Sequence, residues 1–144
     1  YGYEKLTNPL LSKIENLHSY KATACATYTT AGVKCILEHK NTNKLYEILP
    51  NYLYRNNVEV IWKTTNWGEP PIHIKNFYNK TELRKDCEGE ECSYDEILLK
   101  GLQEQILASK KDKILIVLHT STSHGPSYNT KYPSRFENFK PVLN

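Results

Sequence analysis

Lys113-Ile114-Leu115-Ile116-Val117-Leu118 is a continuous apolar run that follows the polar residues Lys110 to Asp112. A short run without a polar residue at every second position predicts a strand that is buried on both faces. Strands of this kind occur in parallel sheets that helices cover on each side. We therefore expect an α/β fold, with a mostly parallel sheet flanked by helices.

Patterns before this run predict one more strand and a helix. Val58-Glu59-Val60-Ile61-Trp62 is rich in β-branched residues and follows Asn56-Asn57, which predicts a strand. Ser93-Tyr94-Asp95-Glu96 has the pattern of a capping box, and apolar residues follow it at helical spacing as far as Ile106. Residues 63–92 show little periodicity and are predicted to form a long loop.

The first fifty residues are predicted to form short elements. Apolar residues follow the start signal Thr7-Asn8-Pro9 at helical spacing, and Pro50 should break or restart a later helix. The elements expected here are a helix with Leu10, Leu11, Ile14 and Leu17 on its apolar face, a strand over His18–Ala24, a helix over Thr29–His39 and a helix that Asn43 caps.

Length and charge limit the classes of function. The 144 residues suit a single domain. The net charge is +3 and the lysines are scattered among glutamates, so nucleic-acid binding is not indicated. No apolar stretch reaches the length of a membrane span, and the chain contains no methionine, not even at its start. We therefore expect a processed piece of a longer protein.

The four cysteines fall into two local pairs, Cys25 with Cys35 and Cys87 with Cys92. Local pairs favour two disulfides and an oxidising compartment. Four cysteines allow three connectivities, and nearness in sequence only favours this one. A structural zinc site is the alternative, although neither pair has the two-residue spacing that is typical of zinc knuckles.

The loop between the first two cysteines carries several hydroxyl groups just before a predicted helix. A threonine hydroxyl is a poor nucleophile unless a base or a metal activates it. The exposed N–H groups and the positive dipole of a helix start favour a phosphate or a sulfate there. The loop therefore predicts a nucleophile acting on an anionic ester. The alternative is an ordinary helix cap beside a structural disulfide.

Polar residues follow both predicted strands. His119 ends the apolar run, Ser121-Thr122-Ser123-His124-Gly125-Pro126 comes next, and Asn66 follows the other strand. Ligands of open α/β sheets bind outside the carboxyl ends of the strands, so these segments are predicted to converge on one crevice. We expect His124 to contact the ligand, with a simple Ser-Gly-Pro turn as the alternative. Ser123 is not expected to be a nucleophile, because adjacent residues seldom form a triad.

Several motifs across the chain carry a resemblance to a known family. They are Gly2-Tyr3, Thr7-Asn8-Pro9, the Cys25–Cys35 loop, Cys92-Ser93-Tyr94-Asp95-Glu96, Val117–Tyr128, Lys131-Tyr132-Pro133 and Phe136–Pro141. These residues closely resemble the phosphoethanolamine transferases of bacterial envelopes, which include the lipid A modifying enzymes behind polymyxin resistance. The resemblance spans nearly the whole chain and implies an alkaline phosphatase/sulfatase-like fold.

The resemblance also implies roles for single residues. Thr29 corresponds to the nucleophile, which also binds zinc, in a loop that a disulfide to Cys35 closes. His124, in the His-Gly-Pro motif, and Asn66 correspond to residues of the phosphoethanolamine headgroup site. Thr30 and His119 receive no role from it.

Zinc is the cofactor that the resemblance implies. Family members bind it with the threonine, with a glutamate upstream of the Gly-Tyr stretch and with a late Asp-His pair, and of these only Thr29 has a counterpart in this sequence. We therefore expect residues 1–144 to be the N-terminal part of a periplasmic catalytic domain, inactive alone. A membrane anchor outside this sequence would hold the parent protein at the periplasmic face of the inner membrane.

The implied reaction transfers phosphoethanolamine from phosphatidylethanolamine to an envelope acceptor such as lipid A, through a covalent intermediate on threonine. One alternative is a sulfatase- or phosphatase-type hydrolase of the same fold, which would release the group to water. The other is a non-catalytic, disulfide-stapled envelope module in which Thr29 only caps a helix.

Overall fold

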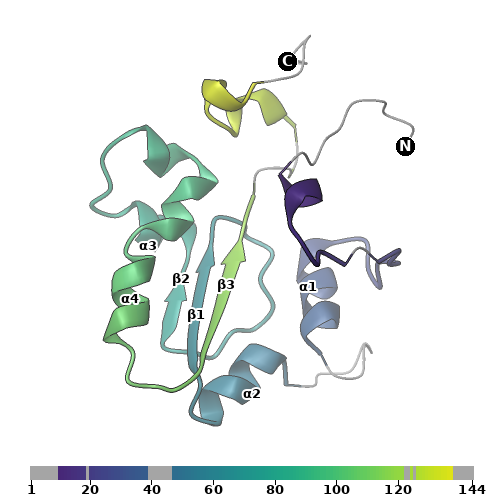
Figure 1. Cartoon of the computed structure of the whole chain (residues 1–144), viewed down its shortest axis with the longest axis vertical. Coiled ribbons are helices and arrows are strands. Elements are labelled where there is room, and N and C mark those ends of the chain that lie inside the picture. The colour runs from purple at the N-terminus through teal and green to yellow at the C-terminus, as the bar shows by residue number, and fades with distance from the viewer. Residues whose placement is uncertain (1–9, 19, 39–46, 122–123, 125, 138–144) are drawn as a thin grey trace.

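The fold is built on a three-stranded parallel sheet. The computed structural model describes residues 10–18, 20–38, 47–121, 124 and 126–137. Its strands are β1 (Glu59–Thr64), β2 (Asn76–Tyr78) and β3 (Ile114–His119), in the order β2-β1-β3 (Figure 1). Both pairs are parallel, as the sequence predicts. The two strands expected from the apolar patterns are therefore confirmed.

The register places the ends of β1 and β3 side by side. Glu59 pairs with Ile114 at the start of the two strands, and Thr64 pairs with His119 at their ends. The polar residues after each strand therefore leave the sheet at the same edge.

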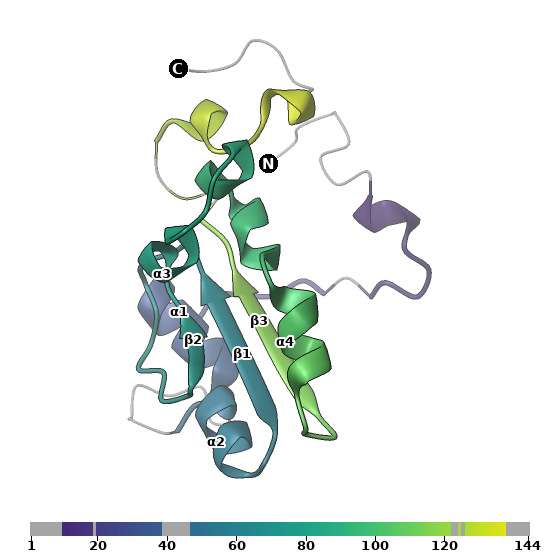
Figure 2. The same cartoon turned by 90° about the vertical axis from the view of Figure 1, so that its left-hand side faces the viewer.

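Helices lie on both sides of the sheet. They are α1 (Thr29–Leu37), α2 (Leu49–Arg55), α3 (Lys80–Arg84) and α4 (Leu102–Ala108). In Figures 1 and 2, α3 and α4 lie on one side of the sheet and α1 lies on the other. The start of α1 and the restart at Pro50, in the first turn of α2, agree with the sequence prediction. Asn43 and His39 lie outside the described residues.

The centre of the sheet is buried, whereas its β3 edge is partly open. Val60, Ile61 and Trp62 of β1 are each 0% exposed, so β1 is the strand covered on both faces. Ile116 and Leu118 of β3 are 36% and 37% exposed, so the expectation that this run is buried on both faces is wrong. Side chains alternate between the two faces of a strand, so Ile116 and Leu118 share one face, and the described residues cover that face only in part.

Lys63 is an unusual member of the buried strand. Lys63 is 1% exposed, and its ammonium group donates a hydrogen bond to the carbonyl of Lys100. The ammonium nitrogen lies 5.8 Å from the ring centroid of Tyr78. Removal from water disfavours the charged form, so burial lowers the pKa of Lys63, and the charge of Glu104 opposes this shift only in part.

The predicted loop over residues 63–92 is only partly irregular, because β2 and α3 lie within it. Helix α3 begins with a capping box, in which Asn79 Oδ1 accepts hydrogen bonds from the N–H groups of Thr81 and Glu82, at 2.9 and 3.1 Å. The Asn79 N–H in turn donates a hydrogen bond to the Glu82 carboxylate, at 2.8 Å. The four-residue pattern that starts at Asn79 was available in the sequence and was missed.

The helix expected after Ser93 is broken. Residues Asp95–Leu99 form a 3₁₀ turn, and Gly101, at φ +64°, separates this turn from α4. Ser93 makes no capping hydrogen bond, so the capping-box prediction is wrong there. The carboxylate of Asp95 reaches across to the sheet instead of capping the turn.

A second small core holds this turn in place. Leu83, Ile97 and Leu98 are buried together, and Tyr78 and the Cys87–Cys92 pair pack against them. The two cysteines form a disulfide with an S–S distance of 2.05 Å, as predicted. The disulfide therefore belongs to the packing that supports the segment leading to Asp95.

The N-terminal segment does not form the predicted elements. Within the described residues 10–18 and 20–24, a 3₁₀ turn over Leu11–Lys13 is the one regular element, and no strand forms. The four residues of the expected apolar face are all at least half exposed: Leu10, Leu11, Ile14 and Leu17. An isolated helix of this length is marginal in water, and no described element covers this face, which explains the difference.

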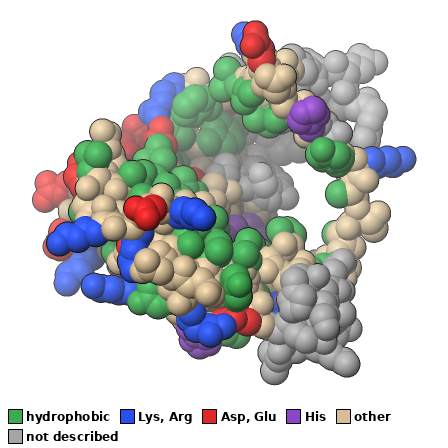
Figure 3. Space-filling view, turned by 60° about the horizontal axis from the view of Figure 1, so that its bottom comes forward, with side chains coloured by type: hydrophobic (Ala, Val, Ile, Leu, Met, Phe, Trp, Pro, Cys, Tyr) green, Lys and Arg blue, Asp and Glu red, His purple; other side chains and the backbone are tan. Residues whose placement is uncertain are grey.

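Positively and negatively charged side chains are mixed on the surface. On the face shown in Figure 3, Lys and Arg side chains alternate with Asp and Glu and do not form a field of one sign. None of the described helices combines the length and the apolar character that crossing a bilayer requires.

Candidate active site

The carboxyl ends of β1 and β3 are joined by hydrogen bonds beyond the last strand residues. The Thr65 N–H donates to the His119 carbonyl at 3.1 Å, and the Asn66 amide donates to the Thr120 carbonyl at 3.1 Å. Asn66 is only 9% exposed. The two segments that the sequence predicts to converge therefore do so.

Asn66 also shapes the loop that follows β1. Its side-chain oxygen accepts hydrogen bonds from the N–H groups of Trp67 and Gly68, at 2.8 and 3.2 Å. The Asn66 N–H donates to the hydroxyl of Thr64 at 3.0 Å. One buried amide thus holds both the turn of residues 66–68 and the first residue after β3, so Asn66 has a structural task in addition to the predicted contact with a headgroup.

Gly68 brings Thr29 to this loop. A Cβ atom added at Gly68 would lie 2.7 Å from Cβ and 3.0 Å from Cγ2 of Thr29. The backbone of the loop and the first residue of α1 are therefore in direct contact, and only a glycine permits this approach. Thr29 and Asn66, predicted from distant segments, therefore lie beside the same glycine.

The hydroxyl of Thr29 is not a helix cap. Tyr28 occupies the N-cap position of α1, in extended conformation, and Thr29 is the first helical residue. The Cys25–Cys35 disulfide closes the loop before it with an S–S distance of 2.04 Å, as predicted. The interpretation in which Thr29 only caps a helix therefore has no support in this geometry.

His124 reaches the same loop through Trp67. The two rings lie 4.5 Å apart between centroids in an edge-to-face arrangement, with an interplanar angle of 69°. Trp67 is 69% exposed although the residues before it are buried. Thr29 contacts Gly68 and His124 contacts Trp67, so both predicted residues flank the loop after Asn66. Ser123 lies outside the described residues.

The structure adds a carboxylate–imidazole pair that the sequence did not reveal. Glu69 Oε1 lies 2.6 Å from His119 Nδ1 and also accepts a hydrogen bond from the Thr64 hydroxyl. The side chains of Glu69 and His119 are 12% and 19% exposed. Glu69 Oε2 is buried and has no hydrogen-bond partner among the described residues. His119 could be noticed at the end of its strand, but no local signal marks Glu69.

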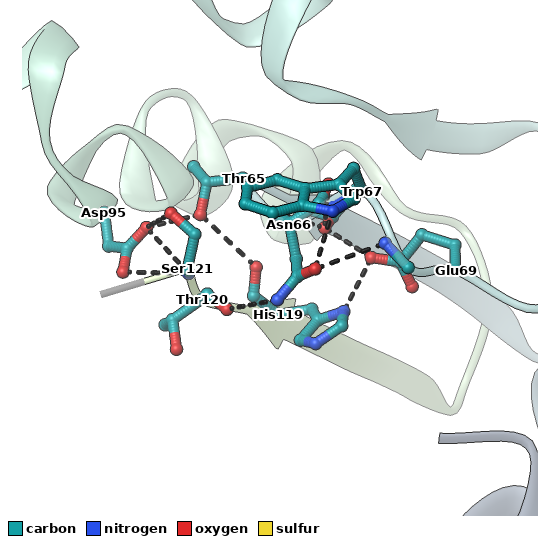
Figure 4. A network of polar contacts seen from close by, with 10 residues as sticks. Thr65, Asn66, Trp67, Glu69, Asp95, His119, Thr120 and Ser121 are labelled. Carbon is teal, nitrogen blue, oxygen red and sulfur yellow. Dashed lines mark hydrogen bonds and ion pairs between the residues drawn. The ribbon is translucent and has the colours of Figure 1, made fainter. Parts of the chain in front are cut away.

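Asp95 is the second residue that the sequence did not reveal as part of this region. In Figure 4, Asp95 and Ser121 lie at one end of the polar network, Glu69 and the ring of His119 lie at the other, and Asn66 lies between them. An apolar hollow of about 480 Å³ near α1 and α2 contains none of these residues. We therefore place the candidate site by the contacts at the strand ends.

Comparison with known proteins shows the family. Residues 1–144 match the sequence model of the Sulfatase family. The chain belongs to the sulfatase family. Its parallel sheet with helices on both sides is consistent with the sulfatase-like α/β fold that the motifs implied.

Curated relatives of this sulfatase-family chain are named as transferases. It is 40% identical over 146 residues to "Phosphoethanolamine transferase EptA" of Helicobacter pylori, covering 98% of this chain and 28% of the relative. It is 33% identical to the EptA of Salmonella typhimurium over 98% of this chain and 27% of that protein, and 27% identical to "Phosphatidylethanolamine transferase Mcr-1" of Escherichia coli over 98% and 29%. The chain thus spans less than a third of the length of these relatives.

The sulfatase-family chain by itself does not fit a complete zinc site. Among the described residues, no three His, Cys, Asp or Glu side chains are grouped so that they could hold a metal ion. The four cysteines form the two disulfides, which excludes the structural zinc alternative for them. We derive no chemical step through zinc from these residues.

Proposed function

We propose that the protein to which this chain belongs transfers phosphoethanolamine from phosphatidylethanolamine to an envelope acceptor such as lipid A. The observation that carries the proposal is the contact of Thr29, at the start of α1, with the loop of Asn66, Trp67 and Gly68 at the carboxyl ends of the strands. The names of the relatives support the transferase class, and the disulfides suit the periplasmic face of the inner membrane.

In the proposed reaction, Thr29 Oγ1 attacks the phosphorus of the donor and forms an O–P bond. Diacylglycerol leaves with the electrons of the broken P–O bond, and its oxygen gains a proton to balance the one that the Thr29 hydroxyl loses. The acceptor oxygen then displaces threonine from the phosphothreonine-type intermediate. First-turn N–H groups of α1 favour the phosphate, because a helix start attracts anions. His124, beside the indole of Trp67, is proposed to contact the headgroup, together with Asn66.

Zinc is proposed as the cofactor, with Thr29 as one ligand and the other ligands outside this sequence. Bound at Thr29, such a metal would supply Lewis-acid chemistry that lowers the pKa of the ligating hydroxyl.

The test is peptide mapping by mass spectrometry after incubation of the full-length protein with phosphatidylethanolamine. We expect an added phosphoethanolamine on the peptide between Cys25 and Cys35, located at Thr29. Thr29→Ala should abolish the adduct and the transfer with the fold intact, whereas the matched neighbour variant Thr30→Ala should keep both. Full transfer by Thr29→Ala would refute the assignment.

The sulfatase family match makes a hydrolase the second candidate. Product analysis separates the two activities, because only a transferase moves the labelled group to a lipid acceptor. Release of free phosphoethanolamine, with no labelled acceptor, would favour the hydrolase. Absence of both an adduct and a product, with the disulfides intact, would favour a non-catalytic envelope module.

A further inference from the structure

Asp95 is the meeting point of hydrogen bonds from two strand ends, although the proposed reaction gives it no task. The Ser121 N–H lies 3.2 and 3.1 Å from the two carboxylate oxygens, and the Ser121 hydroxyl donates to Oδ1 at 3.4 Å. The Thr65 hydroxyl donates to the same oxygen (Figure 4). Hydrogen bonds to an ionised group are stronger than neutral ones, so this carboxylate holds the start of the segment after β3 firmly.

His124 is attached to the residue that Asp95 holds. The His124 N–H donates to the Ser121 carbonyl at 2.9 Å. One peptide unit before, the Thr120 carbonyl is held by Asn66. The N–H of Ser121 is therefore fixed by Asp95 and its carbonyl by His124, so a shift of Ser121 is transmitted to the imidazole.

Asp95 belongs to a turn that packs on a buried core. It opens the 3₁₀ turn Asp95–Leu99, whose residues Ile97 and Leu98 are 1% and 2% exposed. Both belong to the small core against which the Cys87–Cys92 disulfide packs. The disulfide thus packs on this core, the core holds the turn of Asp95, and Asp95 is hydrogen-bonded to Ser121.

We propose that Asp95 is a positioning residue that sets the place of His124 beside Trp67, and so the binding of the donor headgroup. The proposal rests on the proposed function for the role of His124, but not for its placement. Asp95 acts through Ser121 and does not touch the donor.

The test uses Asp95→Asn in the full-length protein. The asparagine amide has the shape of the carboxylate, but its NH₂ group is a donor and cannot accept the hydrogen bond that Ser121 donates to Asp95. Glu96→Gln is the matched control on the same turn, since the Glu96 carboxylate pairs with the exposed Arg135. We expect Asp95→Asn to lower kcat/KM for phosphatidylethanolamine about tenfold, mainly through KM, and Glu96→Gln to leave it unchanged. In the His124→Ala background, Asp95→Asn should cause no further loss.

A purely structural role would give a different result. Asp95→Asn would then cause the same fold loss with and without His124, and this result would overturn the proposal, as would unchanged kinetics. Should Asp95→Asn fail to fold, the isosteric variant Thr65→Val removes one donor to the same carboxylate, and its loss should also vanish without His124.

A second readout does not need activity. Nuclear Overhauser contacts between the rings of Trp67 and His124 should weaken in Asp95→Asn and persist in Glu96→Gln. A wild-type protein without transfer activity would refute the proposed function, whereas this ring contact would still decide the placement of His124. An unchanged contact in Asp95→Asn would overturn the inference.

Discussion

Gly68→Ala tests whether Thr29 must lie against the loop after β1. The added Cβ would lie 2.7 Å from Thr29 Cβ, whereas two carbon atoms prefer about 3.7 Å. The difference is about 1 Å, and Thr29 Cβ cannot rotate away, because it is fixed to the backbone of α1. Either α1 or the loop must therefore move by this amount.

A displacement of about 1 Å between reacting groups can lower a rate about 100-fold. We expect this loss in the transfer rate of full-length Gly68→Ala, with a loss of about 1 to 3 kcal/mol in the free energy of unfolding from overpacking. The assay follows labelled phosphoethanolamine transfer to lipid A, and thermal unfolding is measured in parallel.

Gly32→Ala is the matched control, because it adds the same methyl group to α1 where no atom lies within 4 Å. It should preserve transfer and stabilise the helix by roughly 0.8 to 1 kcal/mol. Transfer by Gly68→Ala at the wild-type rate would show that the contact of Thr29 with the loop is not needed, and would refute this part of the site.

Three further predictions concern stability. Burial lowers the pKa of Lys63 from 10.5, so the unfolded chain keeps this proton to higher pH than the folded chain does. The free energy of unfolding of the wild type, relative to that of Lys63→Met, should therefore rise as the pH is raised from neutral toward 10.5. Urea unfolding curves measure this difference, and a difference that does not change with pH would contradict the burial argument. His119→Ala removes the imidazole that contacts the Glu69 carboxylate and should cost roughly 1.5 to 3 kcal/mol by calorimetry, the usual range for a hydrogen bond to a charged group. The double variant that adds Glu69→Gln should cost less than the sum of the single changes, and strict additivity would argue against a coupled pair. Replacement of both Cys25 and Cys35 by serine removes a disulfide between residues that are 10 positions apart in the sequence. It should lower the free energy of unfolding by about 3 kcal/mol in a denaturant titration. An unchanged free energy would mean that the disulfide does not constrain the unfolded chain.

Local patterns predicted much of the sheet and of the site. The β-branched run of β1 and the apolar run of β3 are strong signals, and both strands formed in parallel. The residues after parallel strands must meet at one edge, so the convergence of Asn66 and His124 followed from the sequence. The two disulfides followed from nearness alone.

Other features depend on contacts that no local pattern encodes. The strand β2 has only three residues, too few for a period to be recognised. Glu69 contacts His119, which lies 50 residues further along the chain, and Asp95 contacts Ser121, which lies 26 residues further, so no local pattern encodes these two contacts. The apolar stripe from Leu10 to Leu17 looks helical, but a stripe needs a partner surface, and the described residues do not provide one.

Parallel pairing of β1 with β3 also sets an order of folding events. Glu59 must wait for Ile114 to emerge during synthesis, whereas the two disulfide loops lie wholly on the N-terminal side of β3. Distant pairings carry a larger loop-closure entropy and form late. Nascent chains should therefore oxidise their cysteines before Thr29 and His124 come together, so that the candidate site assembles on a scaffold that is already cross-linked.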